Sequence, residues 1–155
     1  MLHDPPRDRT GKNVRTMEEK RLIEEAMLLR SEGEYRKAGK LLQRAMEYGS
    51  AEAIYLYGEN VMDAFQRSRV SICSTYETIR EDCEYRQLRC FKESAERGYP
   101  PAMLRLGDLY RDGSSCLEKD LNRAVHWYQR ALRQGEHDAL ARLADPELNR
   151  PKKPL

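Results

Sequence analysis

Four cysteines and three histidines are the side chains of this 155-residue chain that could act as nucleophiles, redox groups or metal ligands. A zinc site usually needs closely spaced ligands, such as Cys-x-x-Cys or two histidines about one helical turn apart. The cysteines are Cys73, Cys83, Cys90 and Cys116, at spacings of 10, 7 and 26 residues. We interpret them as free, buried or half-buried thiols, and we predict no metal and no cofactor. Disulfides and a zinc site are the alternatives.

The histidines do not form a catalytic pair with any neighbouring side chain in the sequence. They are His3, His126 and His137, and none has a serine, cysteine or carboxylate at a spacing that would create a nucleophile and its base. Cys90 and His126 could meet in a folded chain, but any two helices offer such a coincidence. Nucleotide-binding glycine patterns are also absent from the sequence. We therefore predict no catalytic residues and no enzyme.

Small residues recur at a fixed period in the second half of the chain. The pairs separated by 37 residues are Ser94 and Ala131, Gly98 and Gly135, Ala102 and Ala139, and Gly107 and Ala144. A period between about 20 and 50 residues is typical of stacked-repeat proteins. An earlier copy is offset by 49 residues, because Ala45, Gly49, Ala53 and Gly58 precede Ser94, Gly98, Ala102 and Gly107. The earlier unit thus contains an insert.

Within one unit, Ala124, Trp127, Tyr128 and Ala131 fall at positions i, i+3, i+4 and i+7, on one face of a helix. Alanines let a second helix approach this face, and the two aromatic rings fill the volume beside it. Gly107 lies in another helical pattern, where glycine costs about 1 kcal/mol relative to alanine. We therefore predict that Gly107 permits a close approach of two helices.

This unit resembles the Sel-one-like repeat (SLR) family, a relative of the tetratricopeptide repeat. The matching residues are Ala102, Gly107, Tyr110 and Gly113, the loop ending at residues 117–120, the helix with Ala124, Trp127, Tyr128 and Ala131, and the turn at Gly135. The resemblance implies an all-α solenoid of stacked antiparallel hairpins that binds other proteins. It implies no catalytic residues.

The periodic pattern predicts about seven helices. Their expected ranges are 17–31, 35–48, 51–65, 75–97, 100–111, 121–134 and 136–144. Thr16 with Glu19 and Ser74 with Glu77 are capping-box patterns for the first and fourth helices, and Asp120 should cap the sixth. We expect a disordered or loosely docked arm at 1–15, a helical-repeat domain at 16–145 with an insert at about 66–86, and a tail rich in proline and lysine at 146–155.

In the resembling family, the first helix of each hairpin lines a concave groove. The corresponding positions here, which we call the concave groove, are Met27, Arg30, Tyr55, Glu59, Met62, Asp63, Leu104, Asp108, Arg111 and Asp112. Apolar centres with acidic flanks would suit a peptide with basic and apolar side chains. Tyr76, Ile79 and Cys83 on the insert form a possible second contact surface, unless the N-terminal arm or the adjacent loop covers them.

Composition narrows the choice of partner. The net charge is only +2, although 35% of the residues are charged, whereas a nucleic-acid-binding domain usually has a basic face. The sequence also lacks an apolar run long enough for a membrane helix or a signal peptide. We expect a cytoplasmic scaffold or adaptor that binds a protein or peptide, with a bacterial immunity or effector-regulating protein as a narrower form. A cysteine-based redox or metal module, and a nucleic-acid binder with basic tails, are the alternatives. The oligomeric state stays open.

Overall fold

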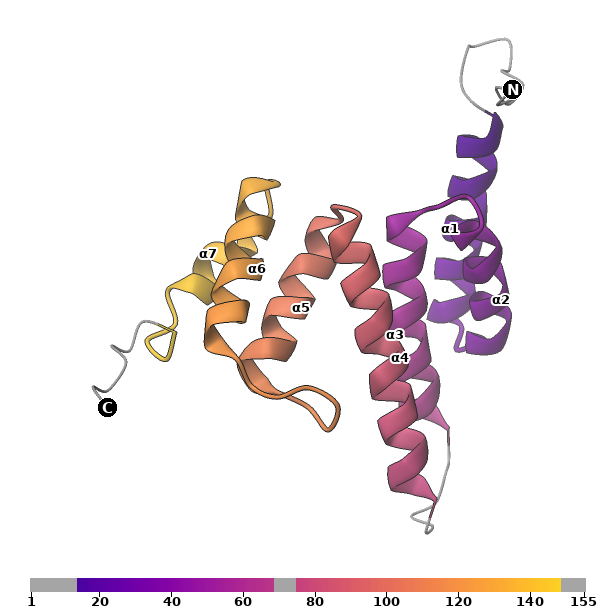
Figure 1. Cartoon of the computed structure of the whole chain (residues 1–155). Coiled ribbons are helices and arrows are strands. Elements are labelled where there is room, and N and C mark those ends of the chain that lie inside the picture. The colour runs from indigo at the N-terminus through magenta and orange to yellow at the C-terminus, as the bar shows by residue number, and fades with distance from the viewer. Residues whose placement is uncertain (1–13, 69–74, 149–155) are drawn as a thin grey trace, which may run out of the picture.

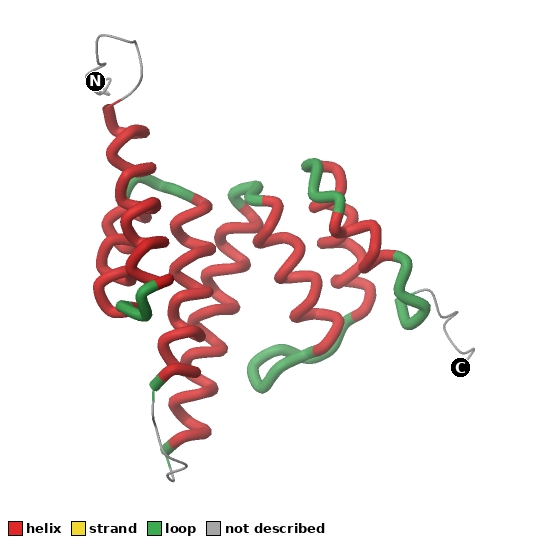
Figure 2. The backbone as a smooth tube through the Cα atoms, turned by 180° about the vertical axis from the view of Figure 1, so that it is seen from behind, coloured by secondary structure: helices red, strands yellow, loops and turns green. Residues whose placement is uncertain are grey.

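The computed structural model describes residues 14–68 and 75–148, and within these ranges the chain folds into seven helices in succession (Figure 1). They are α1 (Val14–Ser31), α2 (Tyr35–Met46), α3 (Ala51–Arg67), α4 (Tyr76–Glu96), α5 (Pro100–Asp112), α6 (Leu121–Arg133) and α7 (Asp138–Leu143). Each helix packs against the next one along the chain. Figure 2 shows only helices and loops in this part of the chain. The prediction of an all-α solenoid is therefore confirmed.

Three hairpins, α1 with α2, α3 with α4 and α5 with α6, are followed by α7 as half of a further hairpin. Residues 1–13, 69–74 and 149–155 lie outside the described residues, together with Cys73, Ser74 and most of the two predicted terminal segments. No described helix is long and apolar enough to cross a membrane.

Two helices, α3 and α6, begin at a residue whose side chain caps the first turn. The Asp120 side chain accepts a hydrogen bond from the Arg123 backbone N–H at 3.0 Å, so the predicted cap of α6 is confirmed. Ser50 caps α3 in the same way by accepting from Ala53 N–H at 3.2 Å. The predicted capping box at Thr16 is wrong, because α1 already begins at Val14 and Thr16 lies inside it.

Each hairpin ends in a glycine turn, which explains part of the repeat pattern. Gly49, Gly98 and Gly135 follow α2, α4 and α6 with backbone φ angles of 84°, 92° and 92°. An L-residue with a side chain is strained in this left-handed region. The periodic glycines thus mark the same turn in three successive units.

A second set of small residues brings paired helices together. A Cβ atom built on Gly107 would lie 2.5 Å from Cε1 of Tyr128, which is completely buried on α6. A Cβ atom on Gly58 would lie 2.9 Å from Cβ of Cys90 on α4. Because real side chains do not approach this closely, both glycines permit close contact between the helices of a hairpin. The predicted role of Gly107 is confirmed.

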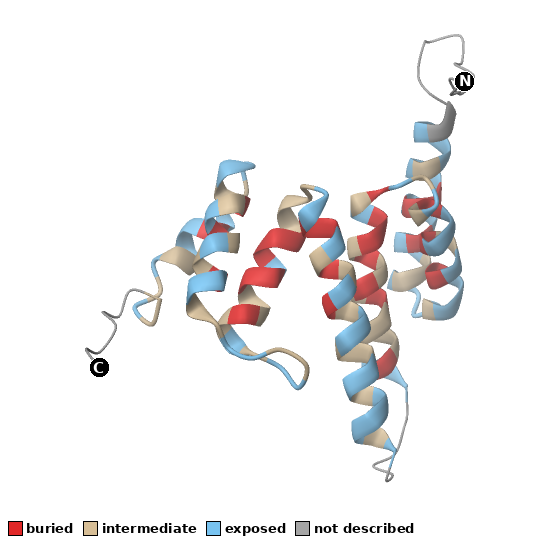
Figure 3. Cartoon of the chain, in the orientation of Figure 1, coloured by how far each residue is buried: buried red, intermediate tan, exposed pale blue. Residues whose placement is uncertain are grey.

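Two apolar clusters form the core, and buried residues follow the contacts between helices (Figure 3). The N-terminal cluster joins α1, α2 and α3 through Leu22, Ala26 and Leu42. The C-terminal cluster extends from α4 to α7 and includes Tyr128. Tyr55 on α3 packs against both clusters. It therefore lies where the two halves of the solenoid meet.

The insert lengthens the second hairpin, because α3 and the N-terminal turns of α4 extend beyond the neighbouring helices (Figure 1). The Tyr76 ring of α4 packs on Phe65 of α3, with ring centroids 5.3 Å apart. The expectation that Tyr76 has no partner within the chain is therefore wrong. Farther along α4, Glu84 accepts hydrogen bonds from the backbone and hydroxyl of Ser115 in the α5–α6 loop.

The C-terminal end of the stack is closed by α7 and the residues after it. Ala139 of α7 is completely buried, and Leu148 packs against the C-terminal cluster. Lys119 in the α5–α6 loop pairs with Glu147 at 2.5 Å. In that loop Leu117 also packs against the C-terminal cluster.

Candidate protein-binding groove

The ten residues assigned to the concave groove lie on the first helices of the three hairpins. Met27 and Arg30 are on α1, Tyr55, Glu59, Met62 and Asp63 are on α3, and Leu104, Asp108, Arg111 and Asp112 are on α5. Leu104 is only 7% exposed and belongs to the C-terminal core, so its side chain is not on the groove surface. The other nine are at least partly exposed. Several of them join helices that are not sequential neighbours.

The first such link joins α1 to α3. Arg30 pairs with Asp63 through Nη2 and Oδ2 at 2.5 Å, and the arginine side chain is only 14% exposed. Its other terminal nitrogen lies 3.9 Å from the sulfur of Met27, which is 46% exposed. The guanidinium is thus held in place, while the thioether beside it faces solvent.

The second link joins α3 to α5 around an aromatic cluster. Glu59 pairs with Arg105 at 3.2 Å. Beside this pair, the Tyr55 ring stacks on Phe91 at 5.2 Å between centroids and contacts Tyr99 at 5.4 Å. Burial and the charge of Glu59 raise the pKa of Tyr55. The Tyr55 hydroxyl therefore remains a neutral hydrogen-bonding group at the junction of the two core clusters.

The third link joins α5 to α6 and α7 through Asp108. Its carboxylate accepts a hydrogen bond from the Tyr128 hydroxyl at 2.8 Å and another from Arg142 Nε at 2.8 Å, and Arg111 lies 3.8 Å away. Burial, followed by the hydrogen bond to Asp108, raises the pKa of Tyr128. Asp108 therefore has a structural role in fixing α7 against α5.

The last predicted pair is local to the end of α5. Arg111 donates two hydrogen bonds to Asp112, at 2.8 and 3.0 Å. These bonds lower the pKa of Asp112 and raise that of Arg111. The Asp112 side chain is 61% exposed, so this pair is open to solvent.

The groove is charge-compensated rather than acidic. Each of its four carboxylates, Glu59, Asp63, Asp108 and Asp112, pairs with an arginine of this chain. Two of these arginines, Arg105 and Arg142, were not singled out from the sequence. They follow their partners by 46 and 34 residues on a different hairpin, and nothing in the repeat pattern marks them. The acidic flanks inferred from the sequence are therefore neutralised within the fold.

The second predicted contact surface is smaller than the sequence indicated. Tyr76 packs on Phe65 and Cys83 is half-buried, so of the three residues only Ile79, at 40%, is widely exposed. The role of this surface in binding a partner remains a prediction.

The cysteines in the described part of the chain are all free thiols: Cys83, Cys90 and Cys116. Burial raises the pKa of Cys90 to about 11 and also raises that of Cys83. A raised pKa leaves little thiolate, the form that attacks electrophiles or binds metals. Within the described residues, no three cysteine, histidine or carboxylate side chains cluster in a way that could hold a metal ion.

Comparisons with known proteins agree with this architecture. Residues 100–136 match the family model described as the Sel1 repeat. The chain is also similar to the crystal structure of a protective antigen present in uropathogenic Escherichia coli strains that displays an SLR fold, with a TM-score of 0.54 and 21% sequence identity. The likeness covers 69% of this chain but 20% of that one, so this chain spans about a fifth of its length. No curated protein matches.

Proposed function

Since this chain is a Sel1-like repeat protein, with a Sel1 repeat at residues 100–136, we propose that it is an adaptor or scaffold that binds a partner protein through the concave groove. Repeats of this family are generally protein interaction modules and typically non-catalytic. An immunity or effector-regulating protein is a narrower form of the same proposal. A non-catalytic role also fits the absence of a catalytic pair from the sequence.

The observation that carries the proposal is the set of ion pairs that crosses the groove. Arg30 with Asp63, Glu59 with Arg105, and Asp108 with Arg142 join α1 to α3, α3 to α5, and α5 to α7. The Glu59–Arg105 pair is exposed and the other two pairs are part-buried, and solvent-exposed pairs typically contribute only about 0–1 kcal/mol each to stability. Their stronger effect is on geometry, because they fix the spacing of the helices before a partner arrives. A preorganised surface loses less entropy on binding.

The partner's chemistry follows from the groove's charge balance. Four carboxylates and four arginines compensate one another, so the groove offers little net charge to a basic or an acidic ligand. The Met27 thioether is 46% exposed and lies beside Arg30, and Met62, the residue before Asp63, is partly exposed. Methionine adapts its shape to apolar ligands. The groove therefore suits a segment that makes mainly apolar contacts and whose binding responds weakly to salt.

Photo-crosslinking from single positions tests this proposal. A photoreactive phenylalanine derivative replaces Met27 in one variant and Leu28 in the matched control, which is the next residue of α1 and is 60% exposed. Both variants are irradiated in lysate from the native host, and crosslinked products are identified by mass spectrometry. We expect a partner to be crosslinked from position 27 and not from position 28. Equal crosslinking from both positions, or from neither, would contradict the groove assignment.

A further inference from the structure

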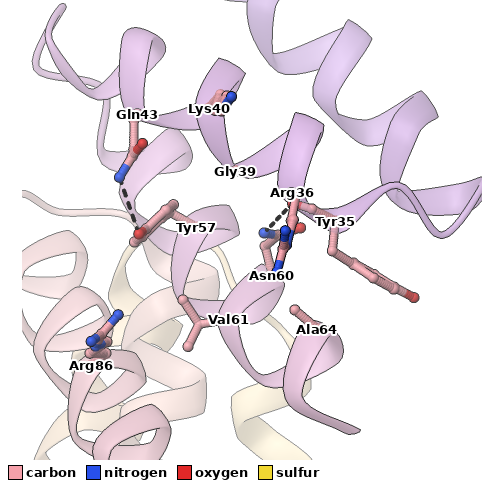
Figure 4. Close-up of a pocket in the computed structure, with 10 residues that line it drawn as sticks. All are labelled: Tyr35, Arg36, Gly39, Lys40, Gln43, Tyr57, Asn60, Val61, Ala64 and Arg86. Atoms are coloured by element: carbon pink, nitrogen blue, oxygen red, sulfur yellow. Dashed lines mark hydrogen bonds between the residues drawn. The ribbon is translucent and has the colours of Figure 1, made fainter. Parts of the chain in front are cut away.

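A hollow of about 320 Å³ lies on another side of the solenoid, between α2 and α3, with Arg86 of α4 at its edge (Figure 4). Gly39, Val61 and Ala64 supply small and apolar lining, and Tyr35 and Tyr57 contribute aromatic side chains. In Figure 4 the Tyr57 hydroxyl accepts a hydrogen bond from Gln43, at 3.2 Å, which ties this side chain to α2. We call this feature the convex hollow.

The convex hollow and the concave groove use opposite faces of α3. Tyr57, Val61 and Ala64 line the hollow, and each follows a groove residue, Tyr55, Glu59 or Met62, by two positions. Two positions correspond to a rotation of about 200° around an α-helix. A ligand in the hollow would therefore not compete directly for the groove, and the two sites can be tested separately.

The positive charges around the hollow are mostly not paired with carboxylates, unlike the charges of the concave groove. Its lining includes the cations Arg36, Lys40 and Arg86 and, among the described residues, no aspartate or glutamate. Arg36 and Lys40 are exposed, and neither side chain forms an ion pair or a hydrogen bond with any residue in 14–68 or 75–148. Arg86 pairs with Asp82 at 2.9 Å but remains 60% exposed. The rim thus has unused positive charge around an apolar floor.

The wall of the hollow also contains a side-chain amide oxygen that accepts no hydrogen bond. Asn60 is only 4% exposed, and its amide donates to the Tyr35 carbonyl at 3.0 Å. Its Oδ1 has no hydrogen-bond partner within the described residues. Gly39 lies opposite, where even a Cβ atom would come within 3.3 Å of Asn60 Nδ2. A small outward movement of Asn60 would let this oxygen accept a peptide N–H, the donor that an extended ligand provides.

A neighbouring hollow of about 500 Å³ continues the same strip toward the end of α3. It shares Tyr35, Arg36 and Ala64 with the convex hollow and adds Arg67. Its single carboxylate, Glu34, pairs with Lys37 at 3.2 Å. The positive character therefore extends beyond one pocket, over a length that would hold a short peptide rather than a single ion.

We propose that the convex hollow binds an acidic peptide segment of a partner protein. An apolar side chain of the segment rests on Val61 and Ala64, and carboxylates on either side of it pair with Arg36, Lys40 and Arg86. Complementary charge sets the specificity and the association rate of such contacts more than it sets their affinity. Binding here is therefore strongly salt-dependent, in contrast to binding at the concave groove.

Fluorescence anisotropy with a defined probe tests this proposal on the full chain. The probe is a labelled peptide with one leucine between two pairs of glutamates, and the control peptide has glutamine at all four flanking positions. The site variant is Arg36→Glu with Lys40→Glu. Its matched control is Lys20→Glu with Arg44→Glu, two exposed residues that line neither hollow and that change the net charge equally. Circular dichroism checks that both variants keep the helical content of the wild type.

We expect the glutamate probe to bind more tightly than the glutamine peptide, and the site variant to lose about tenfold in affinity, because two attractive contacts become repulsive. The control variant should lose no more than about twofold, through screened long-range charge alone. Equal losses in the two variants, or equal binding of the two peptides, would overturn the proposal. The proposal would also be overturned if a short DNA duplex bound more tightly than the probe and the site variant lost that binding. None of these outcomes depends on the groove.

Discussion

The contact between Gly107 and Tyr128 makes the packing of the third hairpin directly testable. Replacing Gly107 with alanine adds one methyl group in the middle of α5. In a helix interior this change should by itself stabilise the fold by about 1 kcal/mol. The new Cβ atom would, however, lie 2.5 Å from Cε1 and 2.6 Å from Cδ1 of Tyr128. The two effects oppose each other, so the sign of the result is informative.

The clash should outweigh the gain in helix propensity. Tyr128 is completely buried and its hydroxyl is held by Asp108, so the ring cannot turn aside without losing that hydrogen bond. Overpacking of this kind typically costs about 1–3 kcal/mol. After subtracting the gain in helix propensity, we therefore expect Gly107→Ala to destabilise the chain by up to about 2 kcal/mol. For a chain of this size, that corresponds to a decrease in Tm of up to about 8 °C.

Gly39→Ala is the matched control, because its Cβ atom would lie 3.3 Å from Nδ2 of Asn60 and 3.9 Å from Cε2 of Tyr57, so the Asn60 amide needs to shift by only a few tenths of an ångström. This variant should be neutral or slightly stabilised. Thermal and urea denaturation, followed by circular dichroism, measure both changes. A second check places Gly107→Ala in a Tyr128→Val background, where all the clashing ring atoms are gone and alanine should stabilise the less stable parent. Stabilisation by Gly107→Ala in the wild-type chain would refute the close-contact argument.

Two further predictions concern single titratable groups. Asp112 has a pKa lowered by its hydrogen bonds from Arg111, so its contribution to stability is present above its unfolded pKa, about 3.9, and is lost as pH falls through the folded value. Urea denaturation between pH 2 and 6 should show that the free energy of unfolding falls slightly less with decreasing pH in Asp112→Asn than in the wild type. The difference is small because the side chain is exposed. A steeper fall in the variant would contradict the assignment. Burial raises the pKa of Cys90 to about 11, so at pH 8 iodoacetamide should alkylate Cys90 far more slowly in the native chain than in urea, as peptide mass spectrometry can measure. Equal rates would show that α3 does not cover this thiol.

Features that depend on local sequence were predictable, because each has a local physical cause. Asp120 caps α6 through a backbone N–H three residues away, and Gly98 and Gly135 form equivalent turns 37 residues apart. The role of Gly107 followed from the cost of glycine within a helical pattern. The start of α1 was missed, because a capping box is a favourable pattern that a helix can simply extend past.

The charge balance of the groove could not be predicted in the same way. Asp63, Glu59 and Asp108 were correctly placed on the first helices of their hairpins, yet each is neutralised by an arginine 33 to 46 residues away. Such pairs depend on how one hairpin stacks on the next. The spacing of residues within a single repeat does not predict that stacking. The Tyr76 and Phe65 contact was missed for a related reason, since it depends on how far α3 extends beside α4.

Two contacts of α4 start directly after the extra turns of the insert. By the 37-residue period, Glu84 and Arg86 correspond to the first turn of α6, which begins at Leu121. Arg86 lies at the edge of the convex hollow, and Glu84 binds Ser115 in the α5–α6 loop. These two residues are two positions apart, so they point to different sides of α4. One side supports the loop of the following repeat, and the other contributes charge to the hollow formed with the preceding hairpin. These two contacts therefore join α4 to the hairpins on either side of it.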